Sequence, residues 1–175
     1  PGGVVVLAAK VVALFIPRCM EVVCIKGKIK ENNVTFKPSA VPLDTKMPIV
    51  VLTNYATASA AEITAGALQD YDRAVIVGQR SYGKGLVQQP RSLPYRGVLK
   101  LTSAKYYIPS GRCVQAYVYK DGAPQHLPDS LAKVFHTAGG RPVRDSGGIT
   151  PDVSVPTDSL PNLLAYLASS NALMD

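Results

Sequence analysis

Three polar side chains in this chain of 175 residues are spaced so that they could form a nucleophile. Ser59 lies in the segment 57–62, Lys84 lies between two glycines in 83–85, and Gln88 follows four residues later. A serine hydroxyl becomes a nucleophile when a neighbouring base, such as a desolvated lysine amine, accepts its proton. The Gln88 amide could orient that amine. These residue types therefore permit acyl-transfer chemistry.

Each signal also has a structural interpretation that the sequence leaves open. Ser59 and Glu62 fit the S-x-x-E capping box that commonly begins a helix. A lysine between glycines, such as Lys84, is typical of a solvated turn. A phosphate-binding loop is excluded, because residues 78–84 lack its glycine spacing and no Ser or Thr follows the lysine.

The elements around these residues predict that Ser59 and Lys84 meet at one edge of a sheet. Residues 48–52 and 73–78 are apolar runs typical of buried parallel strands, and residues 59–71 between them have helical spacing. Adjacent parallel strands end side by side. We therefore expect Ser59 at a strand-to-helix turn near Lys84, where free helix N–H groups favour an oxyanion.

The remaining segments predict an α/β domain with a strand-rich second half, spanning residues 1–175 as one unit. We expect helices over 3–16, 129–138 and 159–173, and strands over 20–26 and 34–37. A longer strand is expected over 98–108, with 112–119 as its hairpin partner across a Pro-Ser-Gly turn.

The composition argues for a folded core and against several other classes of protein. Apolar residues make up 47% of the chain and charged residues 18%, and the apolar run 4–16 is shorter than the ~18 residues of a membrane span. The net charge is +7, yet the basic cluster at Lys26, Lys28 and Lys30 has no interleaved aromatic residues. This pattern argues against nucleic-acid binding.

The cysteines argue against a metal site. Cys19, Cys24 and Cys113 have no CxxC spacing, and His126 and His136 are their only possible imidazole partners. We therefore expect no zinc site and three buried thiols.

Several segments together resemble the carboxyl-terminal processing, or tail-specific, serine proteases. They occur in the order of that family between residue 1 and about residue 155. The matching segments are 57–63, 68–71, 74–78, 83–85, 87–88, 101–102, 105–107, 109–112 and 148–153.

The resemblance implies a Ser/Lys dyad that cleaves proteins near their C-termini without a cofactor or metal. It makes Ser59 the nucleophile, Lys84 the general base, Gln88 the residue that orients it, and Asp70 an acid near the site. The family fold is a ClpP/crotonase-like core of β-α-β units. Family members act on unstructured C-terminal tails in the bacterial periplasm, cell envelope or chloroplast lumen, and a homo-oligomer is possible.

The resemblance also assigns an oxyanion hole. Its donors would be the Ala60 N–H and an N–H of Gly2 or Gly3, which match the end of the family's Asn-x-Gly-Gly motif. The family's Gly-Ser-Ala-Ser-Ala-Ser-Glu corresponds to residues 56–62 here, which keep the nucleophile and lose flanking hydroxyls. The family's PDZ domain and the strand before Gly-Gly are expected to precede Pro1.

The base role sets a physical requirement. A lysine amine ordinarily has a pKa of ~10.4 and is protonated near neutral pH, so a lysine base must be desolvated by burial.

Three other functions stay open: a Ser/His/Asp hydrolase using His126 or His136, a non-catalytic peptide-binding scaffold, and an acyl-CoA hydratase of crotonase architecture. The hydratase would not need the Gly-Lys-Gly segment.

Overall fold

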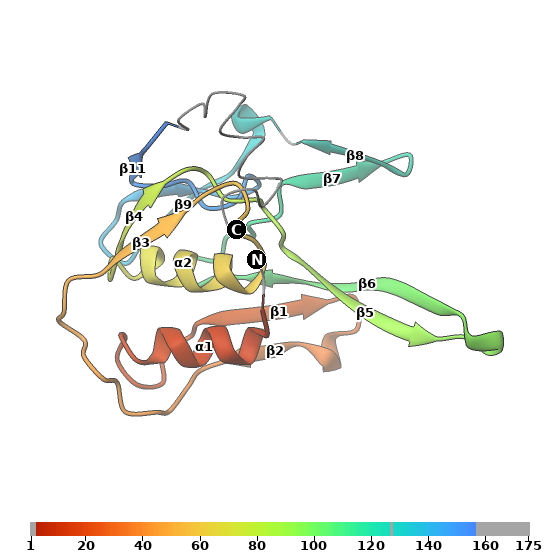
Figure 1. The fold of residues 1–175 in the computed structure, drawn as a ribbon, viewed down its shortest axis with the longest axis horizontal. Coiled ribbons are helices and arrows are strands. Elements are labelled where there is room, and N and C mark those ends of the chain that lie inside the picture. The colour runs from red at the N-terminus through yellow and green to blue at the C-terminus, as the bar shows by residue number, and fades with distance from the viewer. Residues whose placement is uncertain (1–2, 127, 157–175) are drawn as a thin grey trace, which may run out of the picture.

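The computed structural model describes residues 3–126 and 128–156, which form an α/β fold (Figure 1). Among these residues, no helix is long and apolar enough to cross a membrane. The helices are α1 (Val5–Ala13) and α2 (Ala60–Asp70), with 3-10 turns η1 (Lys30–Asn32), η2 (Pro94–Arg96) and η3 (Asp129–Leu131). The strands are β1 (Val23–Gly27), β2 (Val34–Phe36), β3 (Val50–Thr53), β4 (Val75–Gly78), β5 (Leu86–Ser92), β6 (Val98–Tyr107), β7 (Tyr117–Lys120), β8 (Ala123–His126), β9 (Val134–His136), β10 (Pro142–Arg144) and β11 (Val153–Ser154).

A parallel sheet in the order β11-β4-β3 carries the loops that approach Ser59. β3 and β4 pair in parallel, with Val51 opposite Ile76, and α2 connects them. Ile76 is fully buried and belongs to the same core as the apolar residues of α2. The predicted strand-helix-strand unit is therefore confirmed.

A second, antiparallel sheet in the order β2-β1-β6-β5 lies on the other side of α2 (Figure 1). α1 packs beside α2, because Ala8, Ala9 and Val12 form one buried face. α2 is buried along nearly its whole length, including its polar residues Glu62, Gln69 and Asp70. α2 therefore runs through the centre of the described part of the chain.

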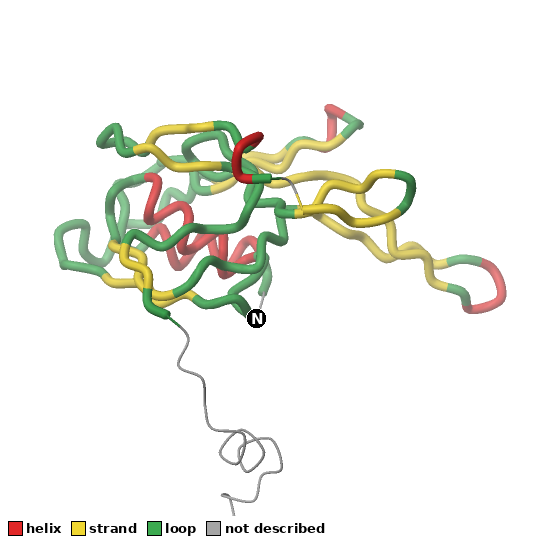
Figure 2. The backbone as a smooth tube through the Cα atoms, turned by 90° about the horizontal axis from the view of Figure 1, so that it is seen from above, coloured by secondary structure: helices red, strands yellow, loops and turns green. Residues whose placement is uncertain are grey.

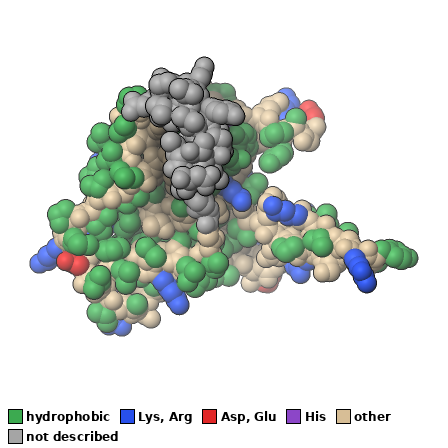
Figure 3. Space-filling view, in the orientation of Figure 1, with side chains coloured by type: hydrophobic (Ala, Val, Ile, Leu, Met, Phe, Trp, Pro, Cys, Tyr) green, Lys and Arg blue, Asp and Glu red, His purple; other side chains and the backbone are tan. Residues whose placement is uncertain are grey.

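Two β-arms project from the same side of the core (Figures 1 and 2). The longer arm is β5, η2 and β6, and the shorter one is the hairpin of β7 and β8. The tip of the longer arm is apolar at the surface in Figure 3, where Tyr95 of η2 is fully exposed. The N-terminal end of α2 lies at the base of both arms.

The hairpin predicted between residues 98–108 and 112–119 is wrong. β6 pairs instead with β5 and β1, and β7 pairs with β8. The chain does turn at residues 108–111, where the Gly111 N–H donates to the Ile108 carbonyl. Beyond that turn residues 113–116 pack against the loop 83–85, and this long-range contact draws the chain away from β6.

Two other expectations are corrected by long-range packing. Residues 129–138 form only the turn η3 and then β9, because Lys133 and residues 134–136 hydrogen-bond to the segment 142–145 instead of closing a helix. Cys19 is exposed, Cys24 is buried and Cys113 is partly buried, so the three cysteines are not all buried thiols. The helix predicted over 159–173 lies outside the described residues.

Candidate active site

Ser59 occupies a strained turn immediately before α2. Its φ is 59° and its ψ is −120°, a conformation that costs free energy for a residue with a Cβ. The main chain holds the turn, since the Glu62 N–H donates to the Ser59 carbonyl at 2.9 Å and the Ser59 N–H donates to Glu62 Oε2 at 2.8 Å. Such a sharp turn presents a serine side chain beside free helix N–H groups.

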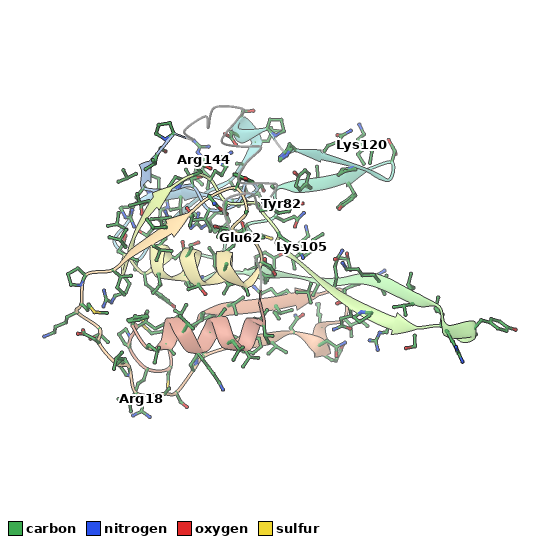
Figure 4. All side chains as sticks on the ribbon, viewed as in Figure 1. Arg18, Glu62, Tyr82, Lys105, Lys120 and Arg144 are labelled. Carbon is green, nitrogen blue, oxygen red and sulfur yellow. The ribbon has the colours of Figure 1, made fainter. Side chains whose placement is uncertain are left out.

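The Glu62 carboxylate joins the serine segment to the lysine segment through hydrogen bonds. Figure 4 labels Glu62 at the end of α2 that lies near the base of the two arms. The carboxylate is fully buried, and besides the Ser59 N–H it accepts hydrogen bonds from Ser81 Oγ at 2.5 Å, from the Gly83 N–H at 2.7 Å and from the Lys84 N–H at 2.8 Å. The capping box predicted at Ser59 is present. Its glutamate does more than cap α2, because the same carboxylate fixes the backbone that carries Lys84.

The glycines on either side of Lys84 allow the lysine loop to approach residues 113–116. Gly83 has a φ of 84°, and a Cβ there would meet Ala116, whose N–H donates to the Gly83 carbonyl at 2.9 Å. A Cβ at Gly85 would lie 2.7 Å from the Gln115 nitrogen. The Gly-Lys-Gly pattern is therefore required by packing as well as by the turn.

Ser59, Lys84 and Gln88 line one cavity of about 240 Å³, together with Val5, Leu86, Val87, Lys100 and Tyr106. The structure describes both side chains of the predicted dyad and shows no hydrogen bond between them, and Lys84 is exposed. The Gln88 amide nitrogen donates to Thr102 Oγ1 at 3.4 Å, and the described residues show no hydrogen bond between Lys84 and the Gln88 carbonyl. The three residues thus share a cavity, while the burial that a lysine base requires is not supplied by the described residues.

The oxyanion donors implied by the family lie next to Ser59. Ala60 opens α2, so its N–H has no acceptor within the helix. A Cβ placed on Gly3 would lie 3.7 Å from Ala60 Cβ, which puts the two backbones side by side. Gly2 lies outside the described residues.

Asp70 lies at the far end of α2 from Ser59. Eleven helical residues separate the two ends, a length of about 16 Å. Asp70 forms a buried ion pair with Arg112, whose Nη2 lies 2.9 Å from Asp70 Oδ1. Burial raises the pKa of Asp70, although the Arg112 guanidinium opposes that change. The structure therefore places Asp70 in the packing of the core and not at the Ser59 side chain.

A second cavity, of about 350 Å³, opens on the other side of Lys84 towards the β7–β8 hairpin. Its lining includes Ala58, Lys84 and Gln88, and also the tyrosines 82, 117 and 119. Tyr82 and Tyr117 lie 6.2 Å apart between ring centroids, and Tyr117 packs against His126. This cavity offers an aromatic, mainly uncharged surface beside the candidate nucleophile.

Two functional features were not predicted from the sequence. Glu62 was recognised as a cap but not as the carboxylate that binds the lysine loop. Tyr106, 1% exposed, lines the Ser59 cavity from β6, and no local pattern marks that contact. The two alternative histidines line neither of these cavities: His126 packs on Tyr117, and His136 lies on β9. The described residues contain no group of three His, Cys, Asp or Glu side chains able to hold a metal.

Comparison with known proteins identifies the class to which this fold and site belong. The family model of peptidase family S41 matches residues 1–123. The chain is 43% identical over 115 residues to a carboxy-terminal-processing protease of Bartonella bacilliformis, covering 66% of this chain and 26% of that protein. A carboxyl-terminal-processing protease of a Synechocystis species is 38% identical over 109 residues, which are 62% of this chain and 25% of that protein.

A solved structure agrees with these relatives. The photosystem II D1 C-terminal processing protease superposes with a TM-score of 0.64 at 27% identity, covering 94% of this chain and 34% of that one. A putative S41 protease from Bacteroides fragilis shares the fold, with a TM-score of 0.59 at 20% identity. The chain belongs to peptidase family S41, which confirms the resemblance found in the sequence. It spans about a quarter of the length of the curated relatives named here.

Proposed function

We propose that the protein containing this chain is a serine endopeptidase of the carboxyl-terminal processing type, with Ser59 as nucleophile and Lys84 as general base. The observation that carries the proposal is the cavity shared by Ser59, Lys84 and Gln88, with Ser59 in its strained turn before α2. Its substrates are proteins with unstructured C-terminal tails, and its place of action is the bacterial periplasm or cell envelope, as the resemblance implies.

The proposed roles of Ser59 and Lys84 define a sequence of proton and electron movements. In these roles the Lys84 amine takes the Ser59 proton as Oγ attacks the substrate carbonyl carbon, and the carbonyl electrons move onto oxygen. The N–H groups of Ala60 and Gly3 then stabilise the oxyanion. Lysine can serve as this base once substrate or neighbouring chain desolvates it, whereas arginine keeps its proton.

The test is hydrolysis of an internally quenched peptide with a free C-terminus. It uses the protein in its longest natural form, with Ser59→Ala beside the control Ser103→Ala, an exposed serine on β6. We expect Ser59→Ala to lower kcat/KM at least about a thousandfold and Ser103→Ala to leave it unchanged. Normal turnover by Ser59→Ala excludes Ser59 as the nucleophile.

A second function, peptide binding without catalysis, is favoured by one observation. Ser59 and Lys84 are both among the described residues. Lys84 is exposed, and no hydrogen bond joins it to Ser59. A binding protein would retain the peptide without cutting it, and a fluorophosphonate would not label Ser59. Labelling of Ser59 together with peptide cleavage decides for the peptidase.

A further inference from the structure

The Tyr106 hydroxyl is buried beside the candidate nucleophile without a hydrogen-bond partner. Tyr106 is 1% exposed, and its oxygen forms no hydrogen bond of acceptable geometry with any described residue. It lines the same cavity of about 240 Å³ as Ser59 and Lys84. A buried hydroxyl without a partner lowers stability, and phenylalanine would fill the same space without that cost. The hydroxyl therefore calls for an explanation other than packing.

The sheet fixes Tyr106 relative to the lysine loop. β6 lies between β1 and β5, and Tyr106 is paired with Ile25 of β1. On the β5 side, the Tyr106 N–H donates to the Gly85 carbonyl at 3.1 Å. The Tyr106 backbone is thus hydrogen-bonded to the residue after Lys84, and the Tyr106 side chain lines the same cavity as Ser59.

The surroundings keep this hydroxyl protonated. Burial raises the pKa of Tyr106 far above its ordinary value, and the Glu62 carboxylate acts in the same direction. The Ser59 side chain lies within reach of the tyrosine oxygen and opposes these effects. Both effects favour the protonated hydroxyl, which can donate a hydrogen bond.

We propose that Tyr106 is a positioning residue that donates its hydroxyl hydrogen to Ser59 Oγ. This inference rests on the proposed function. The hydrogen bond directs the serine proton towards Lys84, and it strengthens as that proton moves to the lysine amine, because the acceptor becomes negatively charged. Tyr106 keeps its own proton throughout, and the new bond forms between Oγ and the substrate carbonyl carbon.

The test compares Tyr106→Phe with Tyr107→Phe in the protein's longest natural form. Tyr107 is the matched control, because it is the next residue of β6 and does not line this cavity. The centroid of its ring lies 5.2 Å from Lys26 Nζ. Loss of a hydrogen bond to a charged oxygen should lower kcat about 10- to 100-fold in Tyr106→Phe. We expect KM and the melting temperature to be retained, and the rate of fluorophosphonate labelling at Ser59 to fall by a similar factor.

The pH profile separates positioning from titration. Because Tyr106 stays neutral, kcat of Tyr106→Phe should fall by the same factor at every pH, and Tyr107→Phe should behave as wild type. Unchanged kcat in Tyr106→Phe overturns the inference, as does a loss that accompanies a lower melting temperature or that occurs only at alkaline pH. If Ser59→Ala retains turnover, the proposed function has failed; if only Tyr106→Phe behaves as wild type, the failure belongs to Tyr106 alone.

Discussion

At the scale of single residues, one buried carboxylate organises the candidate site. Glu62 has no exposed surface and accepts hydrogen bonds from three residues of the lysine segment and from the Ser59 N–H. Each of these donors would be left without its charged acceptor if the carboxylate were lost. The strain at Ser59 is sustained by the same group.

Glu62→Gln should therefore destabilise the fold by about 2–3 kcal/mol, because hydrogen bonds to a charged group are lost and the new NH2 group faces N–H donors. Urea denaturation measures this change. Glu31→Gln, in the exposed turn η1, is the control and should stay within about 0.5 kcal/mol of wild type. Equal stability of the two variants would show that the Glu62 network contributes little.

The general-base role of Lys84 predicts the effect of a substitution, because only a side chain that can accept the serine proton can serve as the base. Lys84→Arg should abolish this activity despite keeping the charge, because a guanidinium stays protonated. Measurement of kcat/KM for both proteins checks this, and near-normal turnover by the arginine variant would show that Lys84 acts through charge or packing.

At the scale of elements, the lysine loop depends on its fit against residues 113–116. Gly83 combines a positive φ with a close approach to Ala116, whereas Gly122 has a similar φ, 79°, and no atom within 4 Å of the position of a Cβ. The two glycines therefore separate backbone strain from steric contact.

Gly83→Ala should lower the free energy of unfolding clearly more than Gly122→Ala does. Gly122→Ala should lower it only by the about 1–2 kcal/mol that a left-handed conformation costs a residue with a Cβ. Peptidase activity should fall in Gly83→Ala alone, because the shift displaces Lys84. Thermal unfolding and kcat/KM of the two variants test this difference. Equal losses of stability would mean that Ala116 shifts to accommodate the new Cβ at little cost in free energy.

The sequence predicts elements well where their signals are local. The buried strands, the helix between them and the serine at the turn all lie within residues 48–78, and the structure confirms this unit. Residues 112–119 and 129–138 were misassigned because their conformations are set by partners distant in the sequence, the loop 83–85 and β10.

In the candidate site, too, the contacts that follow from local signals could be predicted and those set by distant partners could not. Ser59 and Lys84 could be predicted to share an edge, because adjacent parallel strands end together. Tyr106 could not be connected with them, because that contact depends on the order of β1, β6 and β5 in a separate sheet. The four hydrogen bonds of Glu62 likewise depend on how the two loops meet.

At the scale of the whole molecule, the parallel sheet has an exposed apolar face. Val50, Leu52, Val75 and Val153 are all large exposed side chains on β3, β4 and β11. In the register of the sheet, Val50 lies opposite Val75, and Leu52 and Val153 both lie opposite Val77. Figure 3 shows hydrophobic side chains at the surface in this region. Parallel sheets are normally covered on both faces.

We therefore expect this chain of 175 residues to bind a hydrophobic dye such as ANS and to self-associate. Leu52→Lys should reduce both effects. Leu43→Lys is the matched control, because Leu43 is 75% exposed against 77% for Leu52 but lies in a loop outside the sheet. Dye fluorescence and light scattering provide the comparison, and equal behaviour of the two variants would show that the sheet face is not the adhesive surface.

The central claim is that Ser59 is the nucleophile of a family S41 peptidase. Mass spectrometry of the protein in its longest natural form, after reaction with a fluorophosphonate, tests it most directly. The account predicts one phosphonyl adduct, on the peptide that contains Ser59, and slower labelling in Lys84→Arg. An adduct on another serine would contradict it. So would peptide cleavage that continues after complete inhibitor treatment has left Ser59 unmodified.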